Sequence, residues 1–326
     1  MNIGLNNIYR IDIEEEESAR TNHNIISSPI QEYIEFSGRE LIEAIISMGM
    51  QPSELNGRIL NLRKSELIFK INIVQMVFDE KIQNDGTYKL RMNKAAVDLL
   101  DSSEKTAINY WLGMFFATLL AQKIYGYKYA IHYSKFIKSK LAVIKNNTKA
   151  KNVSPDLITM NKFMDKYGVF EAKGGFTIRR SRIEHAYDQV HKIKSINKES
   201  NIDRIVSYFR IREKNSLLRI KDPEGKEIDL KFDQCAAIIW QYIPVIELIH
   251  ECEYGIDGEE IYSSLDLIEG LNGIKINRQF YKVVNNIREI MINDDSESSI
   301  EGYLSEATSI ITSIVNKEID LGIAAF

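Results

Sequence analysis

Two acidic residues and a lysine stand on short apolar segments near the middle of the chain. Asp156 comes directly before the segment LITM, and Glu171 and Lys173 lie within YGVFEAK. Burying charge on apolar segments is costly, so the presence of these side chains suggests a chemical role. Residues two apart on a strand point to the same face, which places Glu171 beside Lys173. If the two segments are neighbouring strands, Asp156 joins them at one edge of a sheet.

Two carboxylates and an amine in that arrangement suit a divalent cation. Carboxylates this close repel each other unless a cation lies between them. Oxygen ligands of this kind suit Mg²⁺ or Mn²⁺, and the backbone carbonyl of Ala172 can supply one more. Such an ion polarises a phosphate and lowers the pKa of a bound water, which Lys173 would orient or deprotonate. The sequence therefore predicts a metal-dependent phosphodiesterase with Asp156, Glu171 and Ala172 as metal ligands.

The same residues resemble the signature of a known nuclease superfamily. Pro155-Asp156 followed by Glu171-Ala172-Lys173 looks like the PD-(D/E)XK motif. The resemblance implies a restriction-endonuclease-like core of αβββαβ order that cleaves DNA with Mg²⁺ or Mn²⁺. By analogy with where such domains occur, it implies an endonuclease of bacterial restriction or anti-phage defence.

The resemblance also suggests a supporting residue on the helix after the third strand. Gln189 looks like the glutamine of the Q-x-x-x-Y motif found in RecB-like members of the superfamily, and it is taken as a catalytic residue. Ile193 stands where that motif has tyrosine. The resemblance covers residues 101–231 and leaves both flanks unassigned.

Two further residues are candidates for the metal site, and each has a structural alternative. His132 lies in the strand-like segment YKYAIHYSKF, where it could reach a metal or simply belong to the core. Glu104 could donate a further carboxylate. Alternatively, Glu104 caps the helix that begins after Asp101, because the two residues match a capping box.

Positive charge is concentrated in the middle third of the chain. Residues 123–231 hold 25 Lys and Arg against 12 Asp and Glu, whereas the remainder holds 17 against 34. A basic segment in an acidic chain predicts a polyanion partner, here DNA, although a solvated basic surface is the alternative. The predicted nucleic-acid contacts lie at a helix start and in a basic loop: Arg179, Arg180, Arg182, Lys145, Lys149 and Lys151.

Hydrophobic patterning places these residues in an α/β chain of mixed α+β type. Residues 1–30 are expected to be poorly ordered, and residues 31–100 to form a small α+β module. Residues 101–231 are the predicted nuclease core. Residues 232–326 are expected to form a helical, acidic C-terminal domain.

Within these regions the pattern predicts particular elements. The segments expected to be helices are QEYIEFSGRELIEAIISMGM, the stretch from Asp101 to Gly126, a helix opened by a Ser181–Glu184 capping box, and CAAIIWQYIPVIELIHE with the helices after it. The segments expected to be strands are LIFKINIVQMVFDE, TYKLRM, YKYAIHYSKF, LITMNKF, YGVFEAK, DRIVSYFRI and LLRI. A hairpin turn is expected at Gln83-Asn84-Asp85-Gly86.

The remaining sequence features concern the location of the protein and its binding partners. No signal peptide or apolar span is apparent, so we expect a cytoplasmic protein with no membrane partner. Cys235 and Cys252 have no CxxC partner, which excludes a cysteine zinc site. The acidic C-terminal helices predict a protein partner or self-association. The alternative to a nuclease is a non-catalytic nucleic-acid-binding or protein-interaction subunit of a larger complex.

Overall fold

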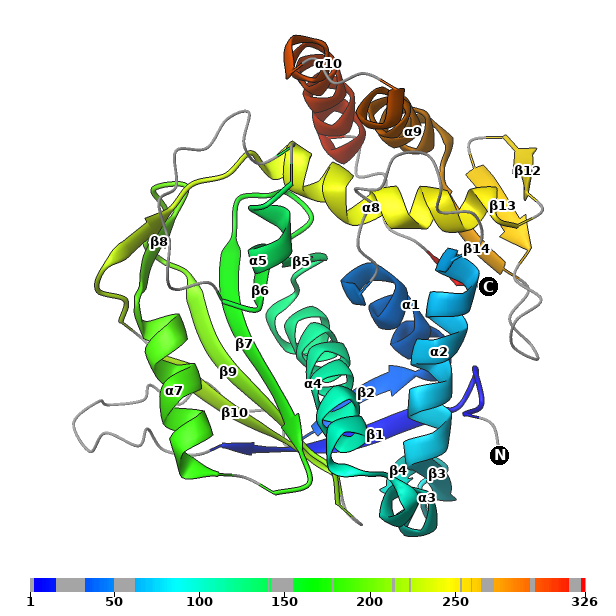
Figure 1. Ribbon diagram of the computed structural model, residues 1–326, viewed down its shortest axis with the longest axis vertical. Helices are drawn as coiled ribbons and strands as arrows, with labels where there is room; N and C mark the ends of the chain where they lie inside the picture. Colours follow the sequence, from blue (N-terminus) through cyan, green and yellow to red (C-terminus); the bar gives the residue numbers. More distant parts are fainter. Residues whose placement is uncertain are drawn as a thin grey trace.

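A curled mixed sheet with helices on both faces forms the centre of the molecule (Figure 1). The computed structural model describes residues 3–15, 33–49, 62–139, 141, 155–177, 179–212, 215–222, 224–252, 254–258, 260–264, 273–293, 297–316 and 324–325. The strand order in the large sheet is β3-β4-β1-β10-β9-β7-β6-β5, and β2 pairs with β1. The fold is therefore of mixed α/β type, as the sequence predicts.

The large sheet joins strands from both halves of the chain. Its strands are β1 (Ile8–Glu15), β2 (Tyr33–Ser37), β3 (Phe78–Ile82), β4 (Tyr88–Met92), β5 (Tyr129–His132), β6 (Leu157–Met160), β7 (Tyr167–Gly175), β9 (Asp203–Arg210) and β10 (Ser216–Asp222). Strands β5, β6 and β7 are antiparallel neighbours, β9 is parallel to β7, and β10 is antiparallel to β9.

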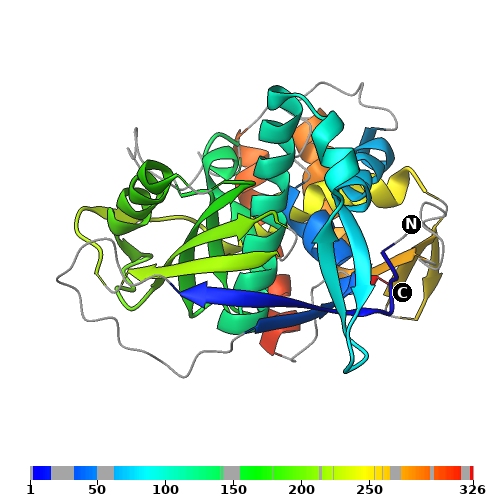
Figure 2. The same ribbon diagram turned by 90° about the horizontal axis from the view of Figure 1, so that it is seen from below.

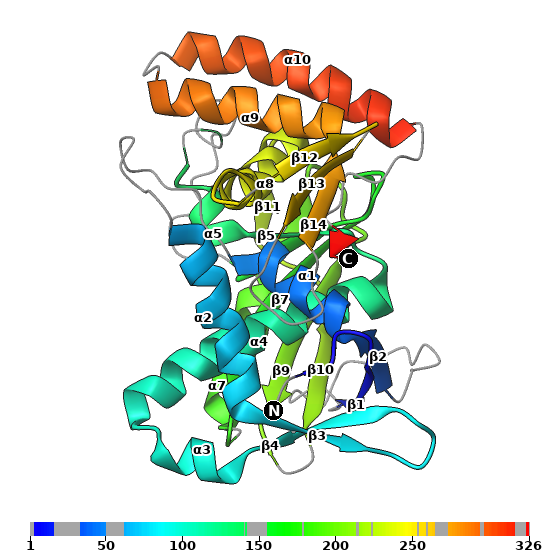
Figure 3. The same cartoon turned by 90° about the vertical axis from the view of Figure 1, so that its right-hand side faces the viewer.

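The helices lie on both sides of the sheet and above it. They are α1 (Gly38–Gly49), α2 (Leu62–Val77), α3 (Lys94–Leu99), α4 (Ser102–Tyr125), α5 (Tyr133–Phe136), α7 (Arg180–His191), α8 (Gln234–His250), α9 (Arg278–Asn293) and α10 (Glu297–Asn316). Strands β7 and β9 run between α7 and α4 in Figure 1. Helices α9 and α10 lie side by side at the top of the molecule, next to α8 (Figure 3). Among the described helices, none is long and apolar enough to cross a membrane.

Two smaller sheets complete the fold. Strand β8 (Ile193–Ile196) pairs with β11 (Ile228–Leu230). A four-stranded sheet in the C-terminal region consists of β12 (Tyr254–Asp257), β13 (Glu260–Ser264), β14 (Gly273–Asn277) and β15 (Ala324–Ala325). The C-terminal region is therefore not purely helical, because short strands alternate with its helices.

Side chains of the central strands alternate between two helical layers. Phe170 of β7 packs edge-on against Tyr125 of α4, and Phe209 of β9 stacks on Phe116 of α4 with 3.7 Å between ring centroids. These residues therefore face α4. Because successive side chains of a strand point to opposite faces, their neighbours Glu171 and Tyr208 face the side covered by α7.

The expectation of a poorly ordered N-terminus is wrong for residues 8–15. These residues form β1, which continues the sheet beyond β10 (Figure 2). Tyr9 and Ile11 are buried, so this strand contributes to the core. The sheet consequently runs across the predicted boundary at residue 100. Residues 16–32 lie outside the described part of the chain.

Four features of the predicted elements differ in the structure. The strand expected over residues 67–80 is wrong for residues 67–77, which belong to helix α2, because buried residues such as Leu67, Ile71 and Val74 recur at helical spacing. Residues 78–80 do form a strand, the first part of β3. Residues 33–37, expected to open a helix, form strand β2, which is followed by α1. The strand after α4 ends at His132, where the short helix α5 begins.

The fourth difference concerns the start of α7. This helix begins at Arg180, and its cap residue Arg179 makes no side-chain capping hydrogen bond. The Ser181–Glu184 capping box is therefore wrong. The Asp101–Glu104 capping box is confirmed at the start of α4, and the hairpin turn is confirmed between β3 and β4.

Candidate active site

The pairing of β6 with β7 brings Asp156 next to Glu171. Leu157 of β6 is the partner of Phe170 in the antiparallel register, so Asp156, one residue earlier, lies opposite Glu171. The Asp156 N–H donates to Glu171 Oε2 at 3.2 Å. In the other direction, the Ala172 N–H donates to Asp156 Oδ2 at 2.9 Å. Both carboxylates are therefore fixed by backbone groups at the edge where β6 begins.

Lys173 lies between the two carboxylates. Its ammonium Nζ donates to Glu171 Oε1, and it lies 3.4 Å from Asp156 Oδ2. We call these three residues the carboxylate centre. The centre has two carboxylates and one ammonium, so with every group ionised it carries one net negative charge.

Burial differs sharply within the carboxylate centre. The Glu171 side chain is 2% exposed, whereas those of Asp156 and Lys173 are 23% and 25% exposed. Burial, and next the negative charge of Asp156, raise the pKa of Glu171 to about 8. Burial also opposes the charge of Lys173, but the two carboxylates outweigh it and raise the pKa of the ammonium. At neutral pH Lys173 is therefore charged, and Glu171 carries a proton much of the time.

Helix α4 supports the centre by unusually close contact with β7. A Cβ at Gly113 would lie 2.6 Å from the backbone carbon of Lys173, and a Cβ at Gly174 would lie 2.2 Å from the backbone oxygen of Asn109. Only glycine fits on either side of this contact. The helix thus packs directly against the backbone that carries Lys173.

The donor set of the centre fits a hard cation that keeps most of its waters. Within the described residues, no group of three or more His, Cys, Asp or Glu side chains could hold a metal ion. Asp156 and Glu171 supply two carboxylates, and Lys173 already holds a positive charge between them. The N–H and C=O of a strand residue point to the same side, so the Ala172 carbonyl faces the Asp156 edge. Mg²⁺ is commonly held by one or two carboxylates, with water completing its shell.

His132 contacts Tyr110 rather than the carboxylates. Its Nε2 lies 2.8 Å from the Tyr110 hydroxyl, and its Nδ1 lies 3.3 Å from the Ser134 hydroxyl. His132 pairs with Leu157, so it lies on the face covered by α4. Burial, together with the charge of Lys135, lowers the pKa of His132 to about 4. The imidazole is therefore neutral at physiological pH.

Glu104 serves as the helix cap of α4. Its Oε2 accepts the Asp101 N–H at 2.8 Å, and the Asp101 carboxylate accepts the Ser103 and Glu104 N–H groups. The residue is exposed near the first turn of the helix, while the contact of α4 with Lys173 lies more than two turns further on, at Gly113. This geometry favours the capping role.

Gln189 lies half-buried on α7. Within the described part of the chain, no hydrogen bond joins it to Asp156, Glu171 or Lys173. Ile193 is buried in β8, where it pairs with Ile228. The structure therefore places Gln189 on the helix that covers the carboxylate face, without direct contact.

The predicted DNA contacts fall into two groups. Lys145, Lys149 and Lys151 lie outside the described residues. Arg179, Arg180 and Arg182 are exposed at the start of α7. Arg180 pairs with Glu184 one turn along the same helix, with 3.1 Å between its Nε and Oε1.

Four residues near the centre were missed by sequence reasoning. They are Tyr110, which contacts His132, and a group at the end of β9 consisting of Tyr208, Arg210 and Arg212. Alternation within DRIVSYFRI could have shown that Tyr208 and Arg210 share a face. Their proximity to Lys173 depends on strand register, which the sequence does not encode locally.

Comparison with known proteins gives no match. No protein-family model matches the chain, and no curated protein or solved structure is significantly similar to it.

Proposed function

We propose that this protein hydrolyses phosphodiester bonds of DNA with the help of Mg²⁺ or Mn²⁺. The observation that carries the proposal is the convergence of Asp156, Glu171 and Lys173 on one point at the edge of β6 and β7. Perturbed carboxyl and amine groups in such a cluster are typical of catalytic sites. By analogy, its role is that of an endonuclease in bacterial restriction or anti-phage defence, acting in the cytoplasm.

The element order supports the resemblance to PD-(D/E)XK nucleases. Helix α4 is followed by the antiparallel strands β5, β6 and β7, then by α7, and β9 returns parallel to β7. This is the αβββαβ order that the resemblance implies, apart from the intervening short elements α5 and β8. Under this resemblance, Asp156 and Glu171 would be the acidic residues of the core.

Each residue of the centre has a defined role in the proposed reaction. Asp156, Glu171 and the Ala172 carbonyl would hold the divalent cation, which supplies Lewis-acid activation of the phosphate and of a bound water. Lys173 carries its positive charge at neutral pH, so it would orient the attacking water and stabilise charge on the phosphate oxygens. Gln189 would support the site from α7 through water, because it makes no direct contact.

The experiment is cleavage of supercoiled plasmid by the purified protein in Mg²⁺, compared with K173A and E171A. We expect each substitution to lower the rate by about 100-fold or more, because both groups act on the reacting phosphate. K166M is the matched control, since Lys166 is an exposed lysine just before β7 that pairs with Asp203. Equal cleavage by the wild type and both variants would overturn the proposal.

A second function is favoured by one specific observation. Lys173 and two backbone N–H groups already give both carboxylates partners, as in a purely structural ion cluster. In that case the protein is a non-catalytic subunit that binds nucleic acid or another protein. Mn²⁺ separates the two functions, because a nuclease site raises the melting temperature through Asp156 and Glu171, whereas a structural cluster gives no metal-dependent shift.

The C-terminal helices are the proposed contact for a protein partner or for self-association. Ile292 of α9 and Tyr303 of α10 are exposed. These helices lie at the top of the molecule, next to α8 and away from α7 (Figure 3). A partner bound there would leave the exposed start of α7 and the partly exposed side chains of Asp156 and Lys173 free to meet DNA. Size-exclusion chromatography with light scattering tests self-association directly.

A further inference from the structure

Arginine side chains gather at the shared end of β7 and β9, next to the carboxylate centre. In the parallel register, Lys173 is the partner of Tyr208, and Gly175 is the partner of Arg210. The Ile211 N–H donates to the Gly175 oxygen at 3.0 Å, which keeps the two strand ends together. The chain then turns at once into α7, whose first residues lie level with the end of β7 in Figure 1.

The arginine of β9 lies on the same face as Lys173. Phe209 stacks against Phe116 of α4, so its neighbours Tyr208 and Arg210 point to the opposite side. That side also carries Glu171 and Lys173. Helix α7 covers this face, so DNA would meet its edge, where the exposed start of α7 and the partly exposed side chains of Asp156 and Lys173 lie.

Tyr208 marks the middle of the arginine group. Its hydroxyl donates to the Thr177 oxygen at 2.8 Å, which ties the connection between β7 and α7 to β9. Burial raises the pKa of Tyr208. Four guanidinium charges act on the same hydroxyl and oppose that increase; they belong to Arg182, Arg210, Arg179 and Arg212. The start of α7 and the end of β9 thus bring four arginines within electrostatic reach of one hydroxyl.

These arginines differ in how they are paired. Within the described ranges, no ion pair joins Arg179, Arg182 or Arg212 to a carboxylate. Arg210 pairs with Glu14 of β1, and its Nε is buried without a hydrogen-bond partner among the described residues. Arg180, by contrast, pairs with Glu184 of its own helix.

We propose that Arg179, Arg182, Arg210 and Arg212 form a phosphate-binding site for the DNA backbone, and that Glu14 competes with phosphate for Arg210. Guanidinium groups bind phosphate oxygens in a bidentate manner. The start of α7 adds a favourable dipole, and no side chain caps its first N–H groups. A bound phosphate relieves the mutual repulsion of the four arginines. The identity of the ligand as DNA rests on the proposed function.

The test is the affinity for a short fluorescein-labelled DNA duplex, measured by fluorescence polarisation in EDTA, where no cleavage can occur. We expect R182A and R212A each to weaken binding and to reduce the slope of log K against log salt by about 0.9, the value for one lost phosphate contact. R180A is the matched control on the same helix and should change the slope by much less. Circular dichroism confirms that each variant is folded.

A charge-matched pair tests the role of Glu14. E14Q and E184Q each remove one negative charge next to an arginine of this region. We expect E14Q to tighten DNA binding several-fold and E184Q to change it less. If R180A weakens binding as much as R182A, or E184Q tightens it as much as E14Q, the arginines act only as diffuse charge and the proposed site is wrong.

The outcome is separable from that of the proposed function. Wild-type cleavage in Mg²⁺ with unchanged binding by R182A and R212A would overturn the phosphate site and leave the nuclease intact. Binding that depends on Arg182 and Arg212, with no cleavage by the wild type, would support the phosphate site and overturn the nuclease.

Discussion

Two clusters of buried charge in this molecule differ in whether their charges balance. The first is the carboxylate centre of Asp156, Glu171 and Lys173, with two carboxylates and one ammonium. The second, which we call the helix network, joins α2 to α8 and α9. Its members are Arg63, Glu66, Lys70, Glu247, Glu251 and Arg288. Apart from Glu289, which pairs with Arg288 at the surface, it contains three positive and three negative side chains, so its charge is balanced.

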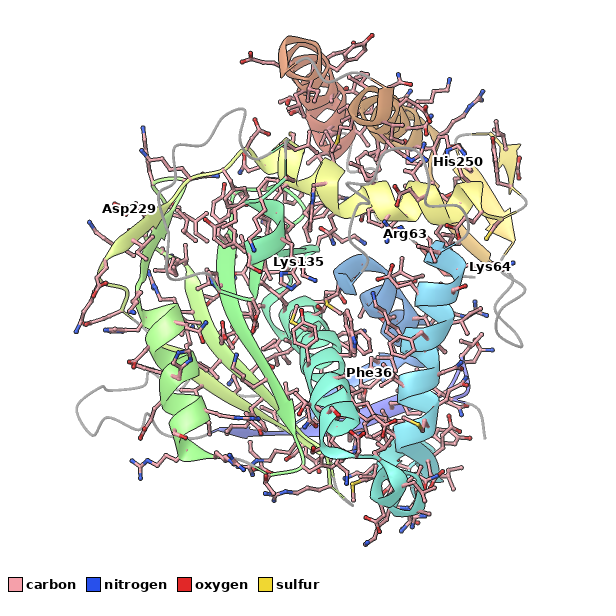
Figure 4. The ribbon with its side chains drawn as sticks, viewed as in Figure 1. Phe36, Arg63, Lys64, Lys135, Asp229 and His250 are labelled. Carbon is pink, nitrogen blue, oxygen red and sulfur yellow. The ribbon has the colours of Figure 1, made fainter. Side chains whose placement is uncertain are left out.

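The helix network is held by short contacts between nearly buried groups. Arg63 Nε lies 2.6 Å from Glu247 Oε2, and Lys70 Nζ lies 2.7 Å from Glu66 Oε1. Glu251 accepts the Arg63 N–H at 2.9 Å, which satisfies the start of α2. Arg63 lies at the end of α2 that faces α8 (Figure 4). The network therefore ties the N-terminal half of the chain to the C-terminal helices.

The difference fits a structural role for the helix network and the proposed catalytic role for the carboxylate centre. Glu247 has positively charged partners on two helices, Arg63 of α2 and Arg288 of α9. Glu171 has one ammonium to share with a second carboxylate, and its pKa is raised to about 8. Carboxyl groups with a strongly raised pKa are concentrated at functional sites. The unbalanced charge of the centre is what a divalent cation would neutralise.

The largest expected effect on stability comes from breaking the helix network. E247A leaves Arg63 nearly buried without its closest partner, so we expect a loss of about 3–5 kcal/mol in the free energy of unfolding. Urea denaturation followed by circular dichroism measures it. The control is E289Q, because Glu289 pairs with Arg288 at the surface and should contribute about 1 kcal/mol or less. Similar losses for both variants would show that the network is not the balanced structural cluster described above.

Removing a charge from the carboxylate centre should instead stabilise the protein. E171Q mimics the protonated carboxyl that burial and Asp156 favour, so we expect a gain on the order of 1–3 kcal/mol at neutral pH without metal. The folded protein binds the Glu171 proton more tightly than the unfolded chain. The contribution of Glu171 to the free energy of unfolding is therefore largest below 4.5, the pKa of the unfolded chain, and is lost as the pH rises through about 8.

The pH dependence of stability provides a second test of the prediction for E171Q. The stability of E171Q relative to the wild type should grow between about pH 5 and about pH 8, as thermal unfolding in EDTA would show. A variant less stable than the wild type throughout this range would mean that the Glu171–Lys173 contact stabilises the fold.

The smallest expected effect is at Lys70. K70M keeps the apolar stem above the Trp111 ring, from which the ammonium lies 4.5 Å, and Glu66 keeps its pair with Arg63. Burial lowers the pKa of Lys70, so removing its charge relieves a desolvation cost. We expect a change of about 1 kcal/mol or less in either direction. A loss as large as that of E247A would mean that every member of the network is indispensable.

The sequence predicted the carboxylate centre better than the fold around it. Asp156, Glu171 and Lys173 could be grouped because strand alternation and a short turn are local properties. Helix α2 was misread as a strand because it contains Ile and Val residues, which favour strands. The helical spacing of its buried residues was the signal for the correct element. Neither the helix network nor the arginines at the end of β9 could be predicted, since both depend on contacts between distant elements.

Binding of Mn²⁺ in the absence of DNA tests the central claim most directly. Titration followed by electron paramagnetic resonance gives the free Mn²⁺ concentration for the wild type, D156N and E171Q. We predict one site in the wild type that is lost or much weakened in both variants, with E247A, where it folds, binding as the wild type does. Equal binding by D156N, E171Q and the wild type, or no binding by any of them, would contradict the account.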